Sequence, residues 1–246
     1  MLEVLYYDRK SIYKTLAESL VIGGLPMRTD EITTEKLHYE VVDAERCIKF
    51  LDDRKENIIE KVYNDKKYLG LTDGVRPLEE HYLIEFGKYY RRGKALGQVK
   101  SGSGHNSMYK GVAFNMVIKF PLYWLKEYQR YHFTDIISSQ STMHKILEFD
   151  LSKMFSDEVD PRCVAVIEEL RDEYNNESDK DKKKDIWRKI INSCPDGLHM
   201  CMGITMNYLQ AISMIQQREN HKLSDWSEDL IPFLLDLPLL KLLMIK

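Results

Sequence analysis

Residues whose side chains could take part in chemistry gather in one stretch of the chain, residues 101–144. The stretch opens with a polar, glycine-rich loop and closes with a second polar loop, Ser138–Ser141. The candidates along it are His105, Ser107, Glu127, Arg130, Tyr131, His132, Ser139, Gln140 and Ser141. They offer a cation, a carboxylate, imidazoles and hydroxyls, the groups with which proteins bind polar ligands and move protons. We expect them to lie near one end of a rigid element.

The element that must position these residues is a strand followed by a helix. Apolar residues recur at every second position from Val112 to Phe120, and this period of two predicts a half-buried strand. Pro121 lacks the N–H that a sheet requires and suits the first turn of a helix, so we expect the strand to pass into a helix there. In that helix Glu127, Arg130 and Tyr131 are spaced to share one face.

A second block of polar residues lies closer to the C-terminal end of the sequence. It consists of Thr205-Met206-Asn207, followed by Ser213 and Arg218. Methionines recur along this region, and we interpret Leu198 to about Glu219 as one long helix. Such a methionine stripe is usually core or a subunit contact.

Taken together, the two blocks resemble the flavin-dependent thymidylate synthase family. In that family a loop histidine precedes a strand, a proline and a helix that ends in an Arg-His-Arg signature, and a serine-containing loop follows. A later helix carries an asparagine with an arginine eleven residues beyond it. The matching positions here are His105, Phe114, Lys119, Pro121, Arg130, Asn207 and Arg218. The signature has changed to Arg130-Tyr131-His132, and the resemblance covers roughly residues 100–145 and 190–230.

The resemblance implies a fold and a reaction. The fold would be α+β, a mixed or antiparallel sheet packed with long helices, in a single domain over residues 1–246. The reaction would transfer a methylene unit from methylenetetrahydrofolate to C5 of a uracil nucleotide. FAD, once reduced, would supply hydride, and NADPH would reduce it again. The family needs no cysteine nucleophile and works as a homotetramer whose sites combine several chains.

The resemblance also implies a role for each candidate residue. The residues expected to bind FAD are His105, Ser107, Arg130, Tyr131, His132, Asn207 and Ser213. The residues expected to bind the pyrimidine nucleotide are Glu127, Ser139, Gln140, Ser141 and Arg218. Ser141 and Arg218 correspond to the family's catalytic positions. The register of the serine loop slips by one residue, so Gln140 and Ser141 remain alternatives for the family's serine.

Some positions depart from the family, mainly on the nucleotide side. An arginine that follows the family's loop serine is Thr142 or Met143 here, and a second one falls on Ile191, where Arg188 or Lys189 could substitute. Glu127 replaces a glutamine and brings a negative charge toward a phosphate, for which Arg130 is the expected partner. Two missing cations weaken a phosphate site by several kcal/mol, at about 1.5–3 kcal/mol for each charged hydrogen bond. The acceptor that the resemblance implies is therefore deoxyuridine monophosphate, a different pyrimidine, or a base without a free monophosphate.

Two other kinds of function stay open beside the enzyme. One is a divergent, non-catalytic homologue that binds a nucleotide or flavin and serves assembly. The other is a structural helical oligomer, because each candidate residue taken alone also has an ordinary explanation. A lone loop histidine is usually a surface residue, and an asparagine in a helix often caps it or bonds back to it.

The remaining elements follow from local patterns. Leu2–Tyr7 has strand character, and Asp8 is expected to cap a helix through Leu20. The segment Ile32–Val42 is ambiguous, with alternation that suggests a strand. Further helices are expected from Asp43 to Val62, from Pro77 to Tyr90, around Trp187 and from Leu223. Another is expected to begin at Asp160-Pro161, with four residues facing the core: Val164, Val166, Ile167 and Leu170. Asn175–Lys184 is expected to be an exposed turn between helices, and the apolar tail Phe233–Ile245 to be core or oligomer surface.

Composition limits the classes of protein that fit. The 246 residues are 43% hydrophobic and 30% charged, and the net charge is −3, so we expect no general nucleic-acid surface. No run approaches the length of a membrane span and no signal peptide is evident, so a cytoplasmic protein with no membrane contact is expected. The four cysteines are Cys47, Cys163, Cys194 and Cys201. They lack metal-finger spacing, so we expect reduced thiols and no metal site.

Overall fold

The computed structural model describes residues 1–24, 31–53 and 105–244, with a few single positions between 89 and 99. The part of the expected Asp43–Val62 helix beyond residue 53, most of the helix expected from Pro77 to Tyr90, and the glycines of the loop before His105 lie outside these residues. The chain forms two compact units. The first consists of Met1–Tyr6, Met116–Thr205 and His221–Leu230, and the second of Tyr7–Asn115, Met206–Asn220 and Ile231–Lys246. Each unit is described by itself.

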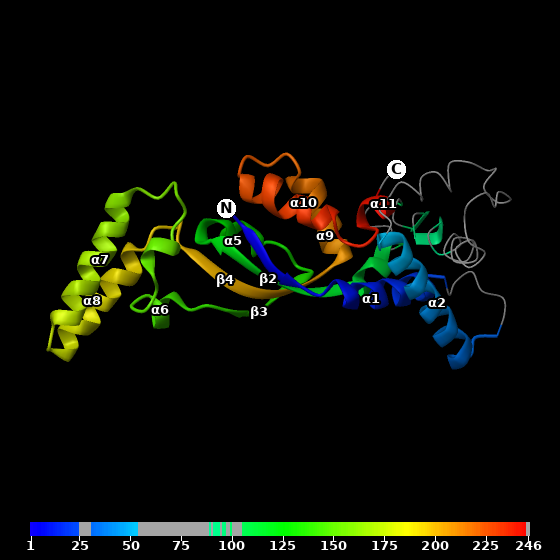
Figure 1. Cartoon of the computed structure of the whole chain (residues 1–246), viewed down its shortest axis with the longest axis horizontal. Coiled ribbons are helices and arrows are strands. Elements are labelled where there is room, and N and C mark those ends of the chain that lie inside the picture. Colours follow the sequence, from blue (N-terminus) through cyan, green and yellow to red (C-terminus); the bar gives the residue numbers. More distant parts are fainter. Residues whose placement is uncertain are drawn as a thin grey trace. The chain divides into compact units, whose positions relative to one another are not determined.

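The fold is α+β, as expected, with one four-stranded antiparallel sheet among helices (Figure 1). The strands are β1 (Glu3–Tyr7), β2 (Ala113–Pro121), β3 (Thr134–Ser139) and β4 (His199–Asn207). Their order across the sheet is β1-β2-β4-β3, so β1 and β3 are its edges. The two central strands each bury one face, whereas β3 is exposed at nearly every residue.

The strand predicted for residues 112–120 is confirmed as β2. Phe114, Met116, Ile118 and Phe120 are buried and the residues between them are more exposed, which is the pattern of a strand with one face on the core. Pro121 ends β2 and caps the start of helix α5 (Leu122–Tyr128), so the expected change from strand to helix also occurs.

The long helix predicted from Leu198 is wrong in its first half. Residues His199–Asn207 form β4, and only Tyr208–Arg218 form a helix, α9. Met202 and Met206 are four residues apart, which suits a helix, but Met200 and Ile204 are buried as well, and residues two apart share one face of a strand. The expectation that the methionines belong to the core is confirmed, because Met200, Met202, Met206 and Met214 are all buried.

The strand suggested for Ile32–Val42 is also wrong, because helix α2 spans Thr34–Asp53. The alternation of Leu37, Tyr39 and Val41 has no structural counterpart. The side of α2 that is buried carries Ala44, Cys47, Ile48 and Leu51, at the three- and four-residue spacing of a helix. The longer helical period therefore decided the element, and the short alternating run was incidental.

In the first unit, a helical hairpin is formed by α7 (Pro161–Asn176) and α8 (Lys180–Ser193). Asp160 caps α7 and Asp179 caps α8, each by accepting hydrogen bonds from backbone N–H groups in the first turn of its helix. The turn between the helices is residues 177–179, shorter than the expected Asn175–Lys184, whose other residues end α7 and begin α8. Ile167 is buried, but Val166 is 45% exposed, which corrects its predicted place in the core. The shorter elements of this unit are α6 (Thr142–Lys145), a 3-10 turn η4 (Leu151–Lys153) and a π-helical turn η5 (Asp225–Leu230).

The second unit is mainly helical. Asp8 caps α1 (Arg9–Ile22), as predicted, by accepting a 3.0 Å hydrogen bond from the N–H of Lys10. Helix α1 packs on α2 and on the 3-10 helix η3 (His105–Gly111), and α9 packs on η3, α10 (Ile231–Leu235) and α11 (Leu240–Met244). Leu234, Leu237, Leu240 and Leu243 are buried, so the described part of the apolar tail is core, one of the two expected alternatives.

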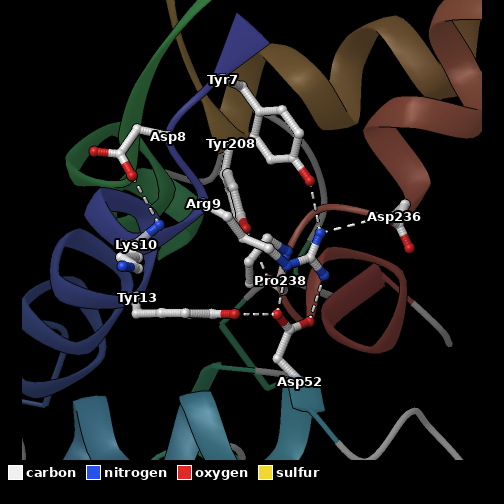
Figure 2. A network of polar contacts seen from close by, with 9 residues as sticks. All are labelled: Tyr7, Asp8, Arg9, Lys10, Tyr13, Asp52, Tyr208, Asp236 and Pro238. Atoms are coloured by element: carbon white, nitrogen blue, oxygen red, sulfur yellow. Dashed lines mark hydrogen bonds and ion pairs between the residues drawn. The ribbon is translucent and has the colours of Figure 1, made fainter.

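Arg9 is the centre of a polar network in the second unit (Figure 2). Its guanidinium donates to both oxygens of Asp52 at 2.6 Å, to the Tyr7 hydroxyl at 2.9 Å and to Asp236 at 3.1 Å. Tyr13 donates to the same Asp52 at 2.5 Å. The hydrogen bonds that Arg9 donates to Asp52 hold the pKa of Arg9 above its usual range, and burial together with Asp52 raises the pKa of Tyr13 to about 12. The network therefore joins α1 to the end of α2 and to the segment after α10.

None of the helices in the described ranges is long and apolar enough to cross a membrane.

Candidate functional site

The predicted site residues divide between the two units. The first unit carries Glu127, Arg130, Tyr131, His132, Ser139, Gln140 and Ser141. The second carries His105, Ser107, Asn207, Ser213 and Arg218. The prediction that Arg130 and Asn207 meet at one ligand joins residues of different units and stays a prediction.

Arg130 lies beyond the end of α5, not on its face. The helix ends at Tyr128, and the N–H groups of Arg130 and Tyr131 donate to Glu127 and Tyr128 in a closing turn, at 3.3 and 3.1 Å. The predicted helical face of Glu127, Arg130 and Tyr131 is therefore wrong. The Arg130 side chain is exposed, and its guanidinium makes no hydrogen bond or ion pair with a described residue. All five of its N–H donors are open to a ligand.

Glu127 pairs with His221 instead of the expected Arg130. The distance from Glu127 Oε2 to His221 Nε2 is 3.5 Å, and both side chains are partly buried. The other ring nitrogen, Nδ1, accepts a 3.2 Å hydrogen bond from the N–H of Leu223. Since Nδ1 is an acceptor, the neutral ring carries its proton on Nε2, facing the carboxylate. His221 was not predicted, and no local signal could have identified a partner so far away in sequence.

An aromatic cluster lies beside this pair. The ring of Trp226 is 6.3 Å from His221, 5.9 Å from Tyr131 and 4.8 Å from Trp124, measured between centroids. Trp124 in turn stacks on Tyr128 at 4.7 Å. Tyr131, the changed residue of the signature, is therefore partly packed against Trp226. Trp124, Tyr128 and Trp226 are fully buried, so Tyr131 and His221 are the members of this cluster whose partly exposed rings can meet a ligand.

The polar segment Ser138–Ser141 is not the loop that was expected, because Ser138 and Ser139 belong to β3. Gln140 continues the pairing with β4: its N–H donates to the carbonyl of Cys201 at 2.9 Å, and its Oε1 accepts from the Cys201 N–H at 2.8 Å. The Gln140 amide is thereby fixed to the sheet. Ser139 is exposed and Ser141 half-buried, just before α6.

Asn207 stands at the junction of β4 and α9, not inside a helix as expected. Its Oδ1 accepts a 2.9 Å hydrogen bond from the N–H of Gln210 and caps α9. Its Nδ2 group makes no hydrogen bond within the described part of the chain, so a donor remains for a ligand. Further along α9, Ser213 accepts from Gln217 at 3.0 Å, and Arg218 lies half-buried in the last turn.

The glycine-rich loop is only partly described. His105 begins η3, and its side chain lies outside the described part; Ser107 is exposed on the same 3-10 helix. The predicted contact of this loop with phosphate stays a prediction.

A further group of polar residues in the first unit was not predicted. Tyr123 donates a 2.6 Å hydrogen bond to the buried Asp225. The pKa of Tyr123 is raised mainly by burial and secondly by this hydrogen bond. His199 is 7% exposed, neither of its ring nitrogens has a partner among the described residues, and burial lowers its pKa. The sequence did not predict that His199 is buried, because residues 199–207 were expected to form a helix and the buried face of the strand β4 was not recognised.

The cysteines have no catalytic setting. Burial raises the pKa of Cys194 to about 11 and also raises that of Cys201, so these thiols are not activated at neutral pH. Over the described ranges, no three His, Cys, Asp or Glu side chains are placed to hold a metal ion.

Comparisons with known proteins are limited. No protein-family model matches the sequence, and no curated protein does. Two solved structures of the flavin-dependent thymidylate synthase ThyX from Helicobacter pylori with FAD and dUMP are similar in chain course. The first has a TM-score of 0.45 and 16% sequence identity, and the match covers 73% of this chain and 84% of that chain. The second has a TM-score of 0.46 and 12% sequence identity, and the match covers 96% of this chain and 92% of that chain. With both TM-scores below 0.5, neither likeness shows the family, and no site or ligand is taken from them.

Proposed function

We propose that this protein binds FAD and uses it in the transfer of a one-carbon unit to C5 of a pyrimidine nucleotide. The observation that carries the proposal is the spacing of the two sequence blocks. Each block is built on a buried central strand that passes into a helix. Arg130 follows α5, which continues β2, and Asn207 stands where β4 passes into α9. Residues next to such elements are positioned by regular structure while their side chains stay accessible to a ligand.

The open donors in the two units suit FAD. Arg130 has a guanidinium without a protein partner in the described residues, which is the fork that binds a diphosphate. Asn207 keeps an Nδ2 donor, suited to the polar edge of the isoalloxazine ring. Tyr131 and His132 would contribute an aromatic wall and a donor, with His105, Ser107 and Ser213 as further contacts. When bound, the flavin supplies hydride chemistry, and these residues bind and orient it.

The acceptor in this proposal is a pyrimidine nucleotide, with methylenetetrahydrofolate as the one-carbon donor and NADPH as the reductant. Arg218 and Ser141 would orient the nucleotide, with Ser139 and Gln140 nearby in the same segment as Ser141. Gln140 already uses its amide oxygen on Cys201, so its amide nitrogen is the group left for the ligand if Gln140 takes the role of the family's serine. The assembly would be a homotetramer in which several chains contribute to each site.

The first test of the proposal is FAD binding by the purified protein, followed by flavin absorption and by quenching of flavin fluorescence. Arg130→Ala and Asn207→Asp are each expected to weaken binding at least tenfold, since a charged or buried hydrogen bond contributes about 1.5–3 kcal/mol. Arg46→Ala, which removes another exposed arginine, is the matched control and should bind as the unchanged protein does. Protein that takes up no FAD would refute the proposal.

The second test is catalysis. With FAD, NADPH and methylenetetrahydrofolate present, the protein should release the C5 hydrogen of a uracil nucleotide and methylate that carbon. A panel of pyrimidine nucleosides and nucleotides would identify the acceptor, and deoxyuridine monophosphate is only one member of it.

A non-catalytic flavin- or nucleotide-binding homologue is the second candidate. Two predicted site residues favour it, because each contacts another residue of the protein: Tyr131 packs on Trp226, and Glu127 pairs with His221. Both contacts give these residues a structural role. FAD binding without hydrogen release from any pyrimidine in the panel would support this function over the enzyme.

A further inference from the structure

The hairpin of α7 and α8 is a rigid part of the first unit. Ile167 and Ile190 are fully buried in it, and the ammonium of Lys183 lies 5.0 Å from the centre of the Tyr174 ring. The middle of each helix is tied to the segment before the hairpin, since Arg171 donates to the carbonyls of Leu147 and Phe149 at 2.8 and 2.9 Å, and Trp187 donates to the carbonyl of Met143 at 3.0 Å. The hairpin extends away from the sheet of its unit (Figure 1).

The exposed charges of the hairpin differ in net sign between its two helices. Helix α7 carries exposed carboxylates at Glu168, Glu169, Asp172 and Glu173 against one exposed cation, Arg162. Helix α8 carries exposed cations at Lys180, Lys182, Lys184, Arg188 and Lys189 against two exposed carboxylates, Asp181 and Asp185. Apart from Arg162, which pairs with Asp160, none of these side chains forms an ion pair with a described residue, although the two helices lie against each other. Each helix therefore presents charge to solvent that its neighbour does not neutralise.

The partner that suits this surface must carry both signs. A polyanion attracted by α8 would meet the carboxylates of α7, and a polycation attracted by α7 would meet the lysines of α8. A second copy of the hairpin, turned about a two-fold axis, sets α7 of each chain against α8 of the other and satisfies both signs at once. Val166 lies on the exposed side of α7, three residues before Glu169 and seven before Glu173, so the same contact would cover an apolar side chain that is 45% exposed.

We infer that the α7–α8 hairpin is a self-association surface, on which the acidic face of α7 in one chain binds the basic face of α8 in a second copy. This inference does not depend on the proposed function. Because opposite charges in solvent attract only over about a Debye length, the contact should be weakened by salt. The helices of the hairpin are formed before they meet, so the ordering that opposes the contact is mainly that of the long charged side chains.

Two charge-reversed variants of the full chain test the inference. One is Glu169→Lys with Glu173→Lys on α7, and the other is Lys182→Glu with Lys189→Glu on α8. Sedimentation at low salt should show that each variant alone has a smaller assembly mass than the unchanged protein, because like charges then face each other. An equimolar mixture of the two should restore the mass, because acidic then meets basic at both contacts.

A control variant reverses charge elsewhere: Glu31→Lys with Glu35→Lys, at exposed positions of the second unit. It should keep the assembly mass of the unchanged protein, and raising the salt concentration about tenfold should reduce that mass to the value of the reversed variants. The inference is overturned if all proteins have one mass at every salt concentration, or if the mixture does not recover. Binding of heparin or RNA that is lost with the α8 reversal and strengthened by the α7 reversal would also overturn it, in favour of a polyanion partner.

Discussion

Arg9 and Arg130 show two different uses of the same side chain in this protein. Arg9, in the second unit, is 30% exposed and bonds both oxygens of Asp52, the Tyr7 hydroxyl and Asp236 (Figure 2). Arg130, in the first unit, is exposed and uses none of its guanidinium donors on a described residue. A cation whose donors are taken by the protein holds elements together and has little left for a ligand. A cation with open donors adds little to stability and is available for recognition.

The largest expected effect comes from breaking the Arg9 network. Arg9→Met should lower the free energy of unfolding by about 3 kcal/mol, because it leaves the Asp52 carboxylate, whose side chain is 10% exposed, without its charged partner. Urea unfolding followed by circular dichroism measures this loss. Arg162→Met is the matched control: Arg162 also pairs with an aspartate, Asp160, but is 89% exposed, so less than about 1 kcal/mol should be lost. Equal losses in the two variants would show that burial does not distinguish the pairs.

His199 is a third case, a buried polar group with no partner in the described residues. Its lowered pKa means that the unfolded chain takes up a proton first as the pH falls below about 6.5, so stability is lost toward acid. His199→Met should remove that loss, which is about 1.4 kcal/mol for each unit of pKa difference. Thermal unfolding between pH 7.5 and 5 measures it. His38→Met, on the exposed side of α2, is the control and should keep the pH dependence of the unchanged protein. If the stability of His199→Met falls with pH as steeply as that of the unchanged protein, the prediction is contradicted.

Asn207 tests whether one residue can both stabilise the fold and bind a ligand. Asn207→Ala should lower stability by about 1 kcal/mol, because α9 loses its cap, and should also lose FAD. Asn207→Asp keeps the capping oxygen but not the Nδ2 donor, so it should unfold like the unchanged protein and still lose FAD. If Asn207→Asp binds FAD normally, Asn207 is only a cap.

Arg130 should give the smallest effect on stability and a large one on binding. Arg130→Ala is expected to change the free energy of unfolding by no more than about 0.5 kcal/mol, as is usual for exposed side chains. The same variant should weaken FAD binding at least tenfold. Denaturant unfolding and a flavin titration on one preparation measure both quantities. A large stability loss would place Arg130 with Arg9, among the residues that hold the fold.

Local patterns were enough to predict several elements. The alternation around Phe114 and the missing N–H of Pro121 act within a few residues, and β2 and α5 follow from them. The caps at Asp8 and Asp160 are local in the same way. For β4 the pattern was ambiguous, because Met202 and Met206 fit both periods. Pairing with β2 and β3, which lie far away in sequence, decided it as a strand.

The candidate site shows the same division. Residue types and spacing identified Arg130 and Asn207 as candidates for one ligand. They did not predict which of the polar atoms of these residues form hydrogen bonds within the protein and which stay available. The cap at Asn207 depends on where β4 ends, and the openness of Arg130 depends on α5 ending at Tyr128. The partner of Glu127 was predicted from the nearest cation in the chain and is instead His221, which only the tertiary structure brings close.

The sequence by itself determined several short-range features of this protein: β2, the helix starts after Asp8, Pro121 and Asp160, the apolar composition of the core and the residue types of the candidate site. Only the tertiary structure decided that His199–Asn207 is a strand, that Arg9 meets Asp52 and that Glu127 meets His221. The physical reason is that periodicity and capping depend on neighbours within about one or two turns of the chain. Strand pairing and ion pairing depend on residues that folding alone brings together.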